Sequence, residues 1–414
     1  MNLALINIAQ LVTVRADGKS FKAGSGMRDL GVIENACVLT ENSSIRWVGP
    51  MAEATMGSLK EANVVDCAGK VVMPGFVDAH THALFAGSRE DEFAMRAGGA
   101  SYQEIAARGG GILSTVKHVR AASKRDLKKL TRPHLNAMLQ HGTTTVEIKS
   151  GYGLDIDSEI KMLEAINELA DEEVIGIIAT FLGAHAVPPE YQGKTQEYVS
   201  LVCDKMIPYV AERGLARFCD VFCERGYFEP PDATRILTRA RDHNLLPKIH
   251  AEELSRLGGA ILAGKLGAAS ADHLEHISDE DIAALRQGSV VAVLLPGVSL
   301  FLNHVYAPAR KLIDAGVPVA LATDFNPGSC MSYSMPLMMT LACTQMRMTP
   351  EEAISASTLN AAAALHLSNE IGSIEVGKKG DMIVLSVPDY RFLPYHFGTN
   401  HVDKIVKDGV LLEF

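Results

Sequence analysis

The chain has 414 residues, of which 47% are hydrophobic and 21% charged, and its formal net charge is −10 at pH 7. This length suits one large domain with an appendage or two domains, and the composition is ordinary for a globular α/β enzyme. The acidic balance argues against a nucleic-acid partner, and no apolar stretch is long enough for a transmembrane helix. Seven scattered cysteines predict reduced thiols and a cytoplasmic protein.

Short strand-like pieces dominate the first 66 residues, at 3–9, 12–14, 31–39, 44–48 and 63–66. From residue 71 onward, apolar runs alternate with helical segments such as 157–171 and 197–213. Eight runs are present, at 71–78, 143–148, 174–182, 218–222, 245–249, 268–274, 290–295 and 317–323. Eight such units favour a closed (β/α)8 barrel of the TIM type over residues 67–369. An open doubly wound sheet is the alternative, but no Gly-rich phosphate loop follows the first run.

The tail returns to strand-like pieces at 374–375, 381–385 and 403–412, with turn signals at 377–380 and 408–409. Neither end of the chain has enough residues for an obvious core of its own. We therefore expect residues 1–66 and 370–414 to pair into one small, discontinuous β-sandwich domain beside the barrel.

The most informative motif is His80-Thr81-His82, directly after the first apolar run. Histidines two residues apart point the same way only on an extended strand, because strand side chains alternate between faces. Two imidazoles on one side of a strand end are half of a catalytic metal site, although two hydrogen-bonded strand-end histidines would give the same motif.

Chemistry in a barrel of this kind gathers at the carboxyl ends of the strands. Polar groups follow seven of the eight runs: His80 and His82, Lys149 to Gly153, His185, Glu224-Arg225, His250 with Glu252-Glu253, Asp272-His273 with Glu275-His276, and Asp324 to Ser329. The seventh run is followed by Pro296-Gly297 instead. A purely structural origin would scatter these groups, so the pattern favours a catalytic site.

His80, His82, His250 and Asp324 make a set of three nitrogens and one carboxylate that leaves one position for water. A metal ion there would lower the pKa of that water toward ~7. We expect a mononuclear site, because a bridging carboxylated lysine is missing after the fourth run. Lys149, after the second run, is the weaker alternative for such a bridge.

Glu253 is the candidate for proton transfer, since a carboxyl group in a dry site can have a raised pKa. Glu252 is the competing choice. His273 is a candidate to stabilise the oxyanion, or else a core histidine bonded to a loop carbonyl. Arg89 is either a clamp for a substrate carboxylate or the partner of a nearby acid at 90–92.

Together these residues resemble the amidohydrolase superfamily over the whole chain, through residues 74–82, His250, His273 and Thr323-Asp324, with 371–381 resembling the return into a small β-domain. Within it, five loops are most similar to the imidazolonepropionase family, at 147–154, 181–190, 250–254, 271–276 and 322–329.

The resemblance implies hydrolysis of the ring amide of 4-imidazolone-5-propanoate to N-formimidoyl-L-glutamate, in histidine degradation. It implies one Zn²⁺ or Fe³⁺ per subunit at the four ligands named above, and a cytoplasmic homodimer. The substrate is a small molecule with a carboxylate, and contacts to it are implied at Arg89, Tyr152, His185, Glu253, Asn326, Gly328 and Ser329.

The mechanism expected from these roles uses Asp324 or Glu253 to deprotonate the attacking water, His273 to hold the oxyanion, and Glu253 to protonate the departing ring nitrogen. One rival is a guanine- or cytosine-type deaminase on the same metal site, which would need no clamp for a carboxylate. A second rival is a non-catalytic scaffold of the same fold, which would be expected to have lost metal ligands.

Overall fold

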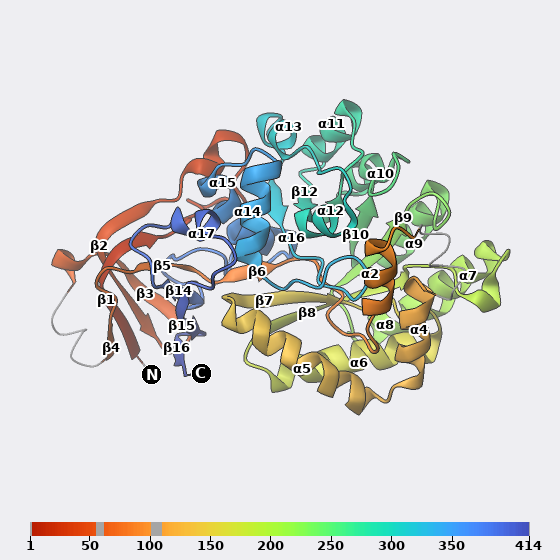
Figure 1. Cartoon of the computed structure of the whole chain (residues 1–414), viewed down its shortest axis with the longest axis horizontal. Coiled ribbons are helices and arrows are strands. Elements are labelled where there is room, and N and C mark those ends of the chain that lie inside the picture. Colours follow the sequence, from red (N-terminus) through yellow and green to blue (C-terminus); the bar gives the residue numbers. More distant parts are fainter. Residues whose placement is uncertain (1, 55–61, 101–109, 414) are drawn as a thin grey trace.

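The computed structural model describes residues 2–54, 62–100 and 110–413, and its strands within these ranges form two sheets (Figure 1). Both chain ends enter the first sheet, in the order β16-β15-β14-β5-β1-β2-β3, with β4 also paired to β1. Its strands are β1 (Asn2–Val12), β2 (Val32–Glu41), β3 (Ser44–Pro50), β4 (Asn63–Asp66), β5 (Val71–Pro74), β14 (Met382–Leu385), β15 (Val402–Lys407) and β16 (Val410–Leu412). The two ends therefore pair as expected, in one mostly antiparallel sheet, and the boundaries 1–66 and 370–414 stay a prediction.

The second sheet is the barrel, in which eight strands pair in parallel and in sequence order. They are β6 (Phe76–Asp78), β7 (Thr143–Lys149), β8 (Gly176–Ala184), β9 (Phe218–Cys223), β10 (Leu246–Ala251), β11 (Ser270–His273), β12 (Val291–Leu294) and β13 (Val319–Leu321). A bridge between Thr81 and Phe325, just beyond β6 and β13, brings the first and last strands together. This arrangement confirms the (β/α)8 fold and rules out the open doubly wound sheet.

The first apolar run divides between the two sheets instead of forming one strand. β5 pairs with β1 and β14, whereas β6 pairs with β7 in the barrel. Gly75 marks the division, because a Cβ atom there would lie 2.3 Å from the side chain of Thr144. Only glycine allows the chain to pass this closely from one sheet to the other.

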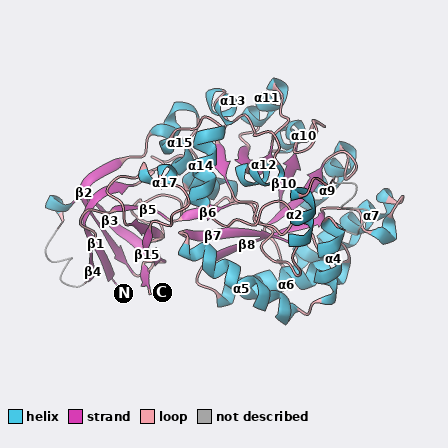
Figure 2. Ribbon diagram, in the orientation of Figure 1, coloured by secondary structure: helices cyan, strands magenta, loops and turns pink. Residues whose placement is uncertain are grey.

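Helices surround the barrel, as the cyan ribbons of Figure 2 show. They are α2 (Glu90–Ala97), α4 (Ile112–Ala121), α5 (Lys124–Gln140), α6 (Ile156–Glu172), α7 (Thr195–Leu201), α8 (Ile207–Glu212), α9 (Pro230–Asp242), α10 (Gly259–Leu266), α11 (Asp279–Gln287), α12 (Pro296–Leu302), α13 (Ala309–Asp314), α14 (Met335–Gln345), α15 (Pro350–Ser357), α16 (Leu359–Ala364) and α17 (Phe392–Tyr395). None of the helices in the described ranges is long and apolar enough to cross a membrane.

The helix expected at 157–171 is confirmed as α6, whose N-cap Asp155 accepts a hydrogen bond from the Ser158 backbone at 2.7 Å. The helix expected at 197–213 is instead interrupted by a π-turn at Val202–Met206 between α7 and α8. Pro208 follows this turn, and because proline lacks an N–H it cannot complete a regular helical ladder there.

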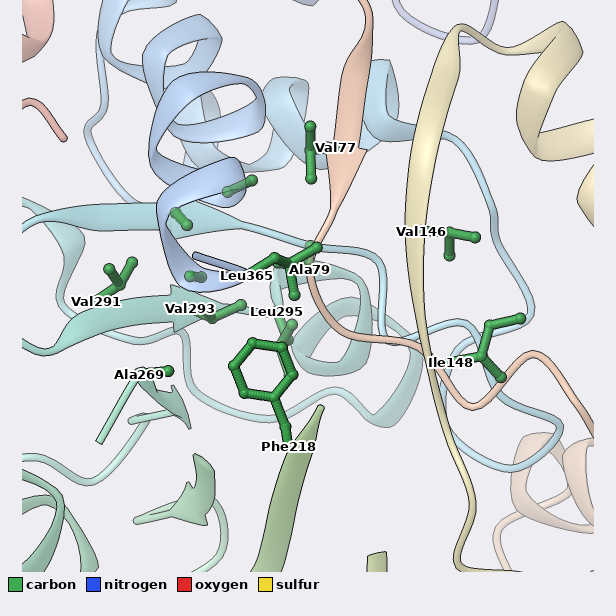
Figure 3. Packing of buried hydrophobic residues seen from close by; sticks show 14 of the residues in the cluster. Val77, Ala79, Val146, Ile148, Phe218, Ala269, Val291, Val293, Leu295 and Leu365 are labelled. Carbon is green, nitrogen blue, oxygen red and sulfur yellow. The ribbon is translucent and has the colours of Figure 1, made fainter. Parts of the chain in front are cut away.

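Alternation along the strands gives the barrel one apolar and one polar face. Val146 and Ile148 of β7 belong to the main hydrophobic cluster, as do Val291 and Val293 of β12 (Figure 3). Glu147 and Lys149 alternate with these two residues along β7, and both are fully buried. Side chains two residues apart share a face, so Glu147 and Lys149 point together into the barrel, beneath the strand ends.

Candidate metal centre and active site

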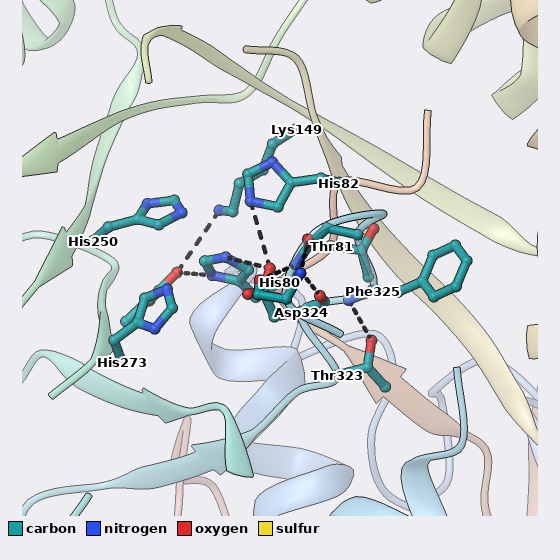
Figure 4. Close-up of polar contacts among 12 residues, drawn as sticks. His80, Thr81, His82, Lys149, His250, His273, Thr323, Asp324 and Phe325 are labelled. Carbon is teal, nitrogen blue, oxygen red and sulfur yellow. Dashed lines mark hydrogen bonds and ion pairs between the residues drawn. The ribbon is translucent and has the colours of Figure 1, made fainter. Parts of the chain in front are cut away.

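The four predicted metal ligands meet at the carboxyl ends of the barrel strands, around the seam between β6 and β13 (Figure 4). The Asp324 backbone N–H donates to the His80 carbonyl at 3.0 Å, and the His82 N–H donates to the Phe325 carbonyl at 3.0 Å. His250 reaches the same place from the end of β10. The closure of the barrel thus fixes three of the four side chains relative to one another.

Their donor atoms are close enough to share an ion. Ligand atoms of His80, His82 and His250 all lie within 4.8 Å of one another, and so do those of His80, Asp324 and His273. Asp324 Oδ1 lies 3.5 Å from Nε2 of both His80 and His82. Two overlapping groups therefore contain all four predicted ligands, with His273 beside them.

The bonding of these side chains fits a metal ion. His80 Nδ1 lies 2.6 Å from Asp272 Oδ2, and His250 Nδ1 lies 3.1 Å from Asp220 Oδ1. Each ring can donate its Nδ1 proton to a carboxylate, which directs the Nε2 lone pair toward the centre, as metal-binding imidazoles require. Nε2 of both rings and Asp324 Oδ1 are buried without a hydrogen-bond partner among the described residues.

Burial keeps His80 and His82 in the form that binds metals. It lowers the pKa of His80 and His82 well below the usual value, and the positive charge of Lys149 adds to this effect at both rings. Neutral imidazole is the ligand form, so the site is prepared for a cation without first losing a proton.

Strained backbone holds several of these strand ends in place. Asp324, Glu252, His273 and Leu274 have φ of +49°, +54°, +80° and +72°. Left-handed backbone is uncommon in residues with a Cβ atom and clusters at functional sites, where the surrounding structure enforces it. In this protein the left-handed residues lie at or just after the ends of β10, β11 and β13.

The two adjacent glutamates after β10 have separate roles. The Glu252 carboxylate accepts hydrogen bonds from the backbone N–H groups of residues 257–260, at 2.6–3.1 Å. It is therefore occupied in holding the start of α10. Glu253 instead lines the cavity above the metal cluster, and burial raises its pKa to about 7. Of the two carboxyl groups, the one of Glu253 is therefore placed at the cavity.

His273 lies between two carboxyl groups. Its Nε2 is 3.6 Å from Glu253 Oε2, and its Nδ1 is 3.9 Å from Glu275 Oε2. Burial lowers the pKa of His273 well below its usual value and raises that of Glu275 well above it. A neutral His273 can donate a hydrogen bond at the mouth of the cluster. Glu275 is a buried neighbour for which no role was predicted.

A cavity of about 610 Å³ opens over the cluster. Every residue predicted to contact substrate lines it: Arg89, Tyr152, His185, Glu253, Asn326, Gly328 and Ser329. It also contains Arg96, which the sequence analysis missed although it lies seven residues, about two helical turns, from Arg89. His304, not expected at the site, lines it too.

Arg89 is bonded to Glu92 and also faces the cavity. Its Nε and Nη2 donate to the two Glu92 oxygens at 2.9 and 2.7 Å, so the acid partner considered for it is present. Its Nη1 lies against Gly328, where a Cβ atom would be only 2.0 Å away. Asn326 holds this loop by accepting the backbone N–H groups of Gly328 and Ser329, each at 2.8 Å.

A layer of buried charge lies beneath the cluster. Lys149 Nζ is 2.8 Å from Asp220 Oδ2 and 2.9 Å from Glu147 Oε2, and all three side chains are fully buried. Burial lowers the pKa of Lys149, but the surrounding carboxylates raise it above its usual value. Lys149 is thus an ammonium paired with carboxylates, which disfavours the alternative in which it bridges two metals.

The comparisons with known proteins agree with the fold. Residues 71–412 match the amidohydrolase family, so the chain belongs to this family. Solved structures show the fold: Escherichia coli guanine deaminase has a TM-score of 0.75 at 16% identity, covering 100% of this chain and 99% of that chain. An adenosine deaminase from Xanthomonas campestris with bound zinc has a TM-score of 0.72 at 18% identity, covering 99% and 92%.

Much more similar sequences place the chain in one branch of that family, the imidazolonepropionases. The Geobacillus kaustophilus imidazolonepropionase is 50% identical over 403 residues, covering 97% of this chain and 95% of that protein. Imidazolonepropionases of Symbiobacterium thermophilum and Parabacteroides distasonis are 48% and 47% identical, covering 100% and 98% of this chain and 97% of each relative.

Proposed function

We propose that this chain hydrolyses the ring amide of 4-imidazolone-5-propanoate to N-formimidoyl-L-glutamate, a step of histidine degradation. The observation that carries the proposal is the content of one cavity: an imidazole–carboxylate cluster, a carboxyl group with a pKa of about 7, and an arginine beside a glycine. The near full-length identity to imidazolonepropionases supports this substrate.

His80, His82, His250 and Asp324 would hold one Zn²⁺ or Fe³⁺ ion per subunit. The ion would supply Lewis-acid chemistry, polarising the ring carbonyl and lowering the pKa of a water. The orphaned Nε2 atoms of His80 and His250, with the orphaned Asp324 oxygen, support this assignment. Because imidazole and carboxylate suit both ions, the choice between them belongs to metal analysis.

Proton transfer falls to the carboxyl groups around the cluster. Asp324 or Glu253 takes the proton of the attacking water, whose oxygen forms the new bond to the ring carbonyl carbon. His273, held neutral, donates to the oxygen that becomes negative. As the C–N bond breaks, Glu253 gives its proton to the departing ring nitrogen, for which a pKa near the working pH is suitable.

The propanoate group would be bound at the arginine side of the cavity. Arg89 keeps its bonds to Glu92 while Nη1 faces the cavity beside Gly328. Nη1 can therefore add one charge-assisted hydrogen bond to a carboxylate, without losing its support. Tyr152, His185, Asn326 and Ser329 complete the polar wall, with His185 stacked on His82 at 5.0 Å between ring centroids.

The rival functions are weaker on this evidence. The nucleobase substrate of a deaminase carries no carboxylate to meet the arginines of the cavity. The guanine deaminase neighbour shows only a shared fold at 16% identity. A non-catalytic scaffold does not explain a complete, buried ligand set with its supporting carboxylates. A homodimer in the cytoplasm remains part of this proposal, to be tested by sedimentation and localisation.

The decisive experiment follows the absorbance of 4-imidazolone-5-propanoate after adding purified protein, with matched chelated and metal-restored samples. We expect fast loss that depends on metal and yields N-formimidoyl-L-glutamate. If a sample with about one metal per chain causes no loss, this substrate is wrong. Ammonia release from guanine or cytosine would then support the deaminase.

A further inference from the structure

The charged layer beneath the cluster has two lysines that differ in what they contact. It consists of Glu147, Lys149, Asp220, Lys248 and Asp272, all fully buried on the inner face of the barrel. Both lysines bond to Glu147, Lys149 at 2.9 Å and Lys248 at 2.8 Å. Only Lys149 also reaches the two aspartates, at 2.8 Å for Asp220 and 3.7 Å for Asp272.

These aspartates are the groups that orient two of the predicted ligands. Asp220 uses Oδ1 for His250 Nδ1 and Oδ2 for Lys149, so its two oxygens are fixed from opposite ends. Asp272 uses Oδ2 for His80 Nδ1, with Lys149 on the same oxygen. One ammonium group therefore contacts the carboxylates behind both rings.

We propose that Lys149 is a positioning residue for the metal centre, which sets the orientation of His80 and His250 through Asp272 and Asp220. This inference rests on the metal site of the proposed function. The three donors of an ammonium group can satisfy several carboxylates at once, and groups behind metal-binding histidines typically change metal affinity 10- to 100-fold.

Without Lys149, the two carboxylates would lose the contact that fixes them. Asp220 Oδ2 would be a buried, unpaired charge. The carboxylates of Asp220 and Asp272 would also repel each other in a medium of low dielectric. Rotation of the Asp220 carboxylate away from Asp272 would break its contact with His250 Nδ1, so the His250 ring would no longer present Nε2 in one direction. The expected result is a looser and less uniform set of ligands.

Lys248 provides the matched control within the same layer. Apart from Glu147, its ammonium donates to the Ala79 carbonyl at 2.9 Å, and it makes no ion pair with Asp220 or Asp272 among the described residues. Its charge still acts on Asp272 through space. Comparing the two lysines therefore separates direct contact from the general effect of a buried positive charge.

The test compares two charge-balanced double variants, Lys149→Met/Glu147→Gln and Lys248→Met/Glu147→Gln. Each removes one positive and one negative buried charge, so both leave the net charge of the layer unchanged. Zn²⁺ affinity is measured on the full-length, metal-free proteins by competition with a chromophoric chelator. The visible absorption of the Co²⁺-loaded proteins reports the ligand geometry.

We expect the Lys149 variant to lose Zn²⁺ affinity by about 10- to 100-fold and to change the Co²⁺ spectrum, with the Lys248 variant within about 3-fold of the unaltered protein. Equal affinities of the two variants would overturn the proposal. If either variant does not fold, Lys149→Gln and Lys248→Gln replace the pair, under the same criterion. Unaltered protein that binds zinc but does not hydrolyse 4-imidazolone-5-propanoate would refute the proposed reaction and leave this inference standing.

Discussion

The substitution Glu253→Gln separates proton transfer from metal binding. Glutamine keeps the size of the side chain but cannot donate a proton from a carboxyl group with a pKa of about 7. Glu253 is not part of either ligand group, so the metal content should not change. General acid–base groups typically contribute 10²- to 10⁴-fold, and we expect kcat to fall by at least ~100-fold.

The neighbouring substitution Glu252→Gln is the control, with the opposite expected outcome. Glu252 accepts four backbone N–H groups, and an amide NH₂ cannot replace a carboxylate oxygen as an acceptor. Leaving such donors unpaired should lower the free energy of unfolding by about 2 kcal/mol. At a temperature where this variant remains folded, its kcat should stay within a few-fold of the unaltered protein.

The assay for both variants combines three measurements on the same preparation. They are the initial rate of 4-imidazolone-5-propanoate loss, metal content by mass spectrometry, and the urea concentration at the unfolding midpoint. A Glu253→Gln variant with full metal and near-normal kcat would refute the assignment of this residue to proton transfer. A silent Glu252→Gln variant would refute the structural role given to Glu252.

Three further predictions follow from contacts at the site. Gly328→Ala should lower kcat/KM by ~10- to 100-fold, chiefly through KM, because the new Cβ atom would lie 2.0 Å from Arg89 Nη1 and would displace it. Gly26→Ala is the control and should be silent, because a Cβ atom there would have no other atom within 4 Å. Asp272→Asn should weaken Zn²⁺ binding by about 10- to 100-fold in a chelator competition, and unchanged affinity would contradict its orienting role. In metal-free protein, burial raises the pKa of Glu253 to about 7 from 4.5. The folded state then binds the Glu253 proton more tightly than the unfolded state does. The contribution of Glu253 to the free energy of unfolding is therefore fully present below pH ~4.5 and is lost as pH rises through ~7, by at most about 3 kcal/mol. Urea unfolding across this pH range should show the loss in the unaltered protein and not in Glu253→Gln.

Much of the fold was predictable because two periodicities in the sequence are clear. Apolar runs separated by helical patterns define the barrel units, and the count of eight selects closure over an open sheet. The division at Gly75 was not predictable from the run Val71–Asp78, because apolar residues look alike in either sheet. The interruption at Val202–Met206 has a signal in Pro208, which the helical pattern around it conceals.

The site was predictable where function-bearing residues follow a strand, and less so where they lie within one. His80, His82, His250 and Asp324 all stand at strand ends, and the structure brings them together. Asp220 and Lys248 lie inside apolar runs and were passed over as parts of strands. A charged residue within an otherwise apolar run is itself the signal, because burying an unpaired charge costs too much to occur without a partner.

The carboxyl end of β10 shows why spacing decides function in this barrel. Lys248 and His250, two residues apart, both point inward, one into the charged layer and one to the metal centre. Glu252 itself has a left-handed backbone; its carboxylate bonds to the backbone of α10, and that of Glu253 lies at the cavity. Insertion of one residue between Lys248 and His250 would exchange inner and outer faces, so it should abolish metal binding as well as turnover. An insertion after Glu253 should leave zinc binding intact, and measuring both variants by metal analysis would test whether the strand register itself places the ligands.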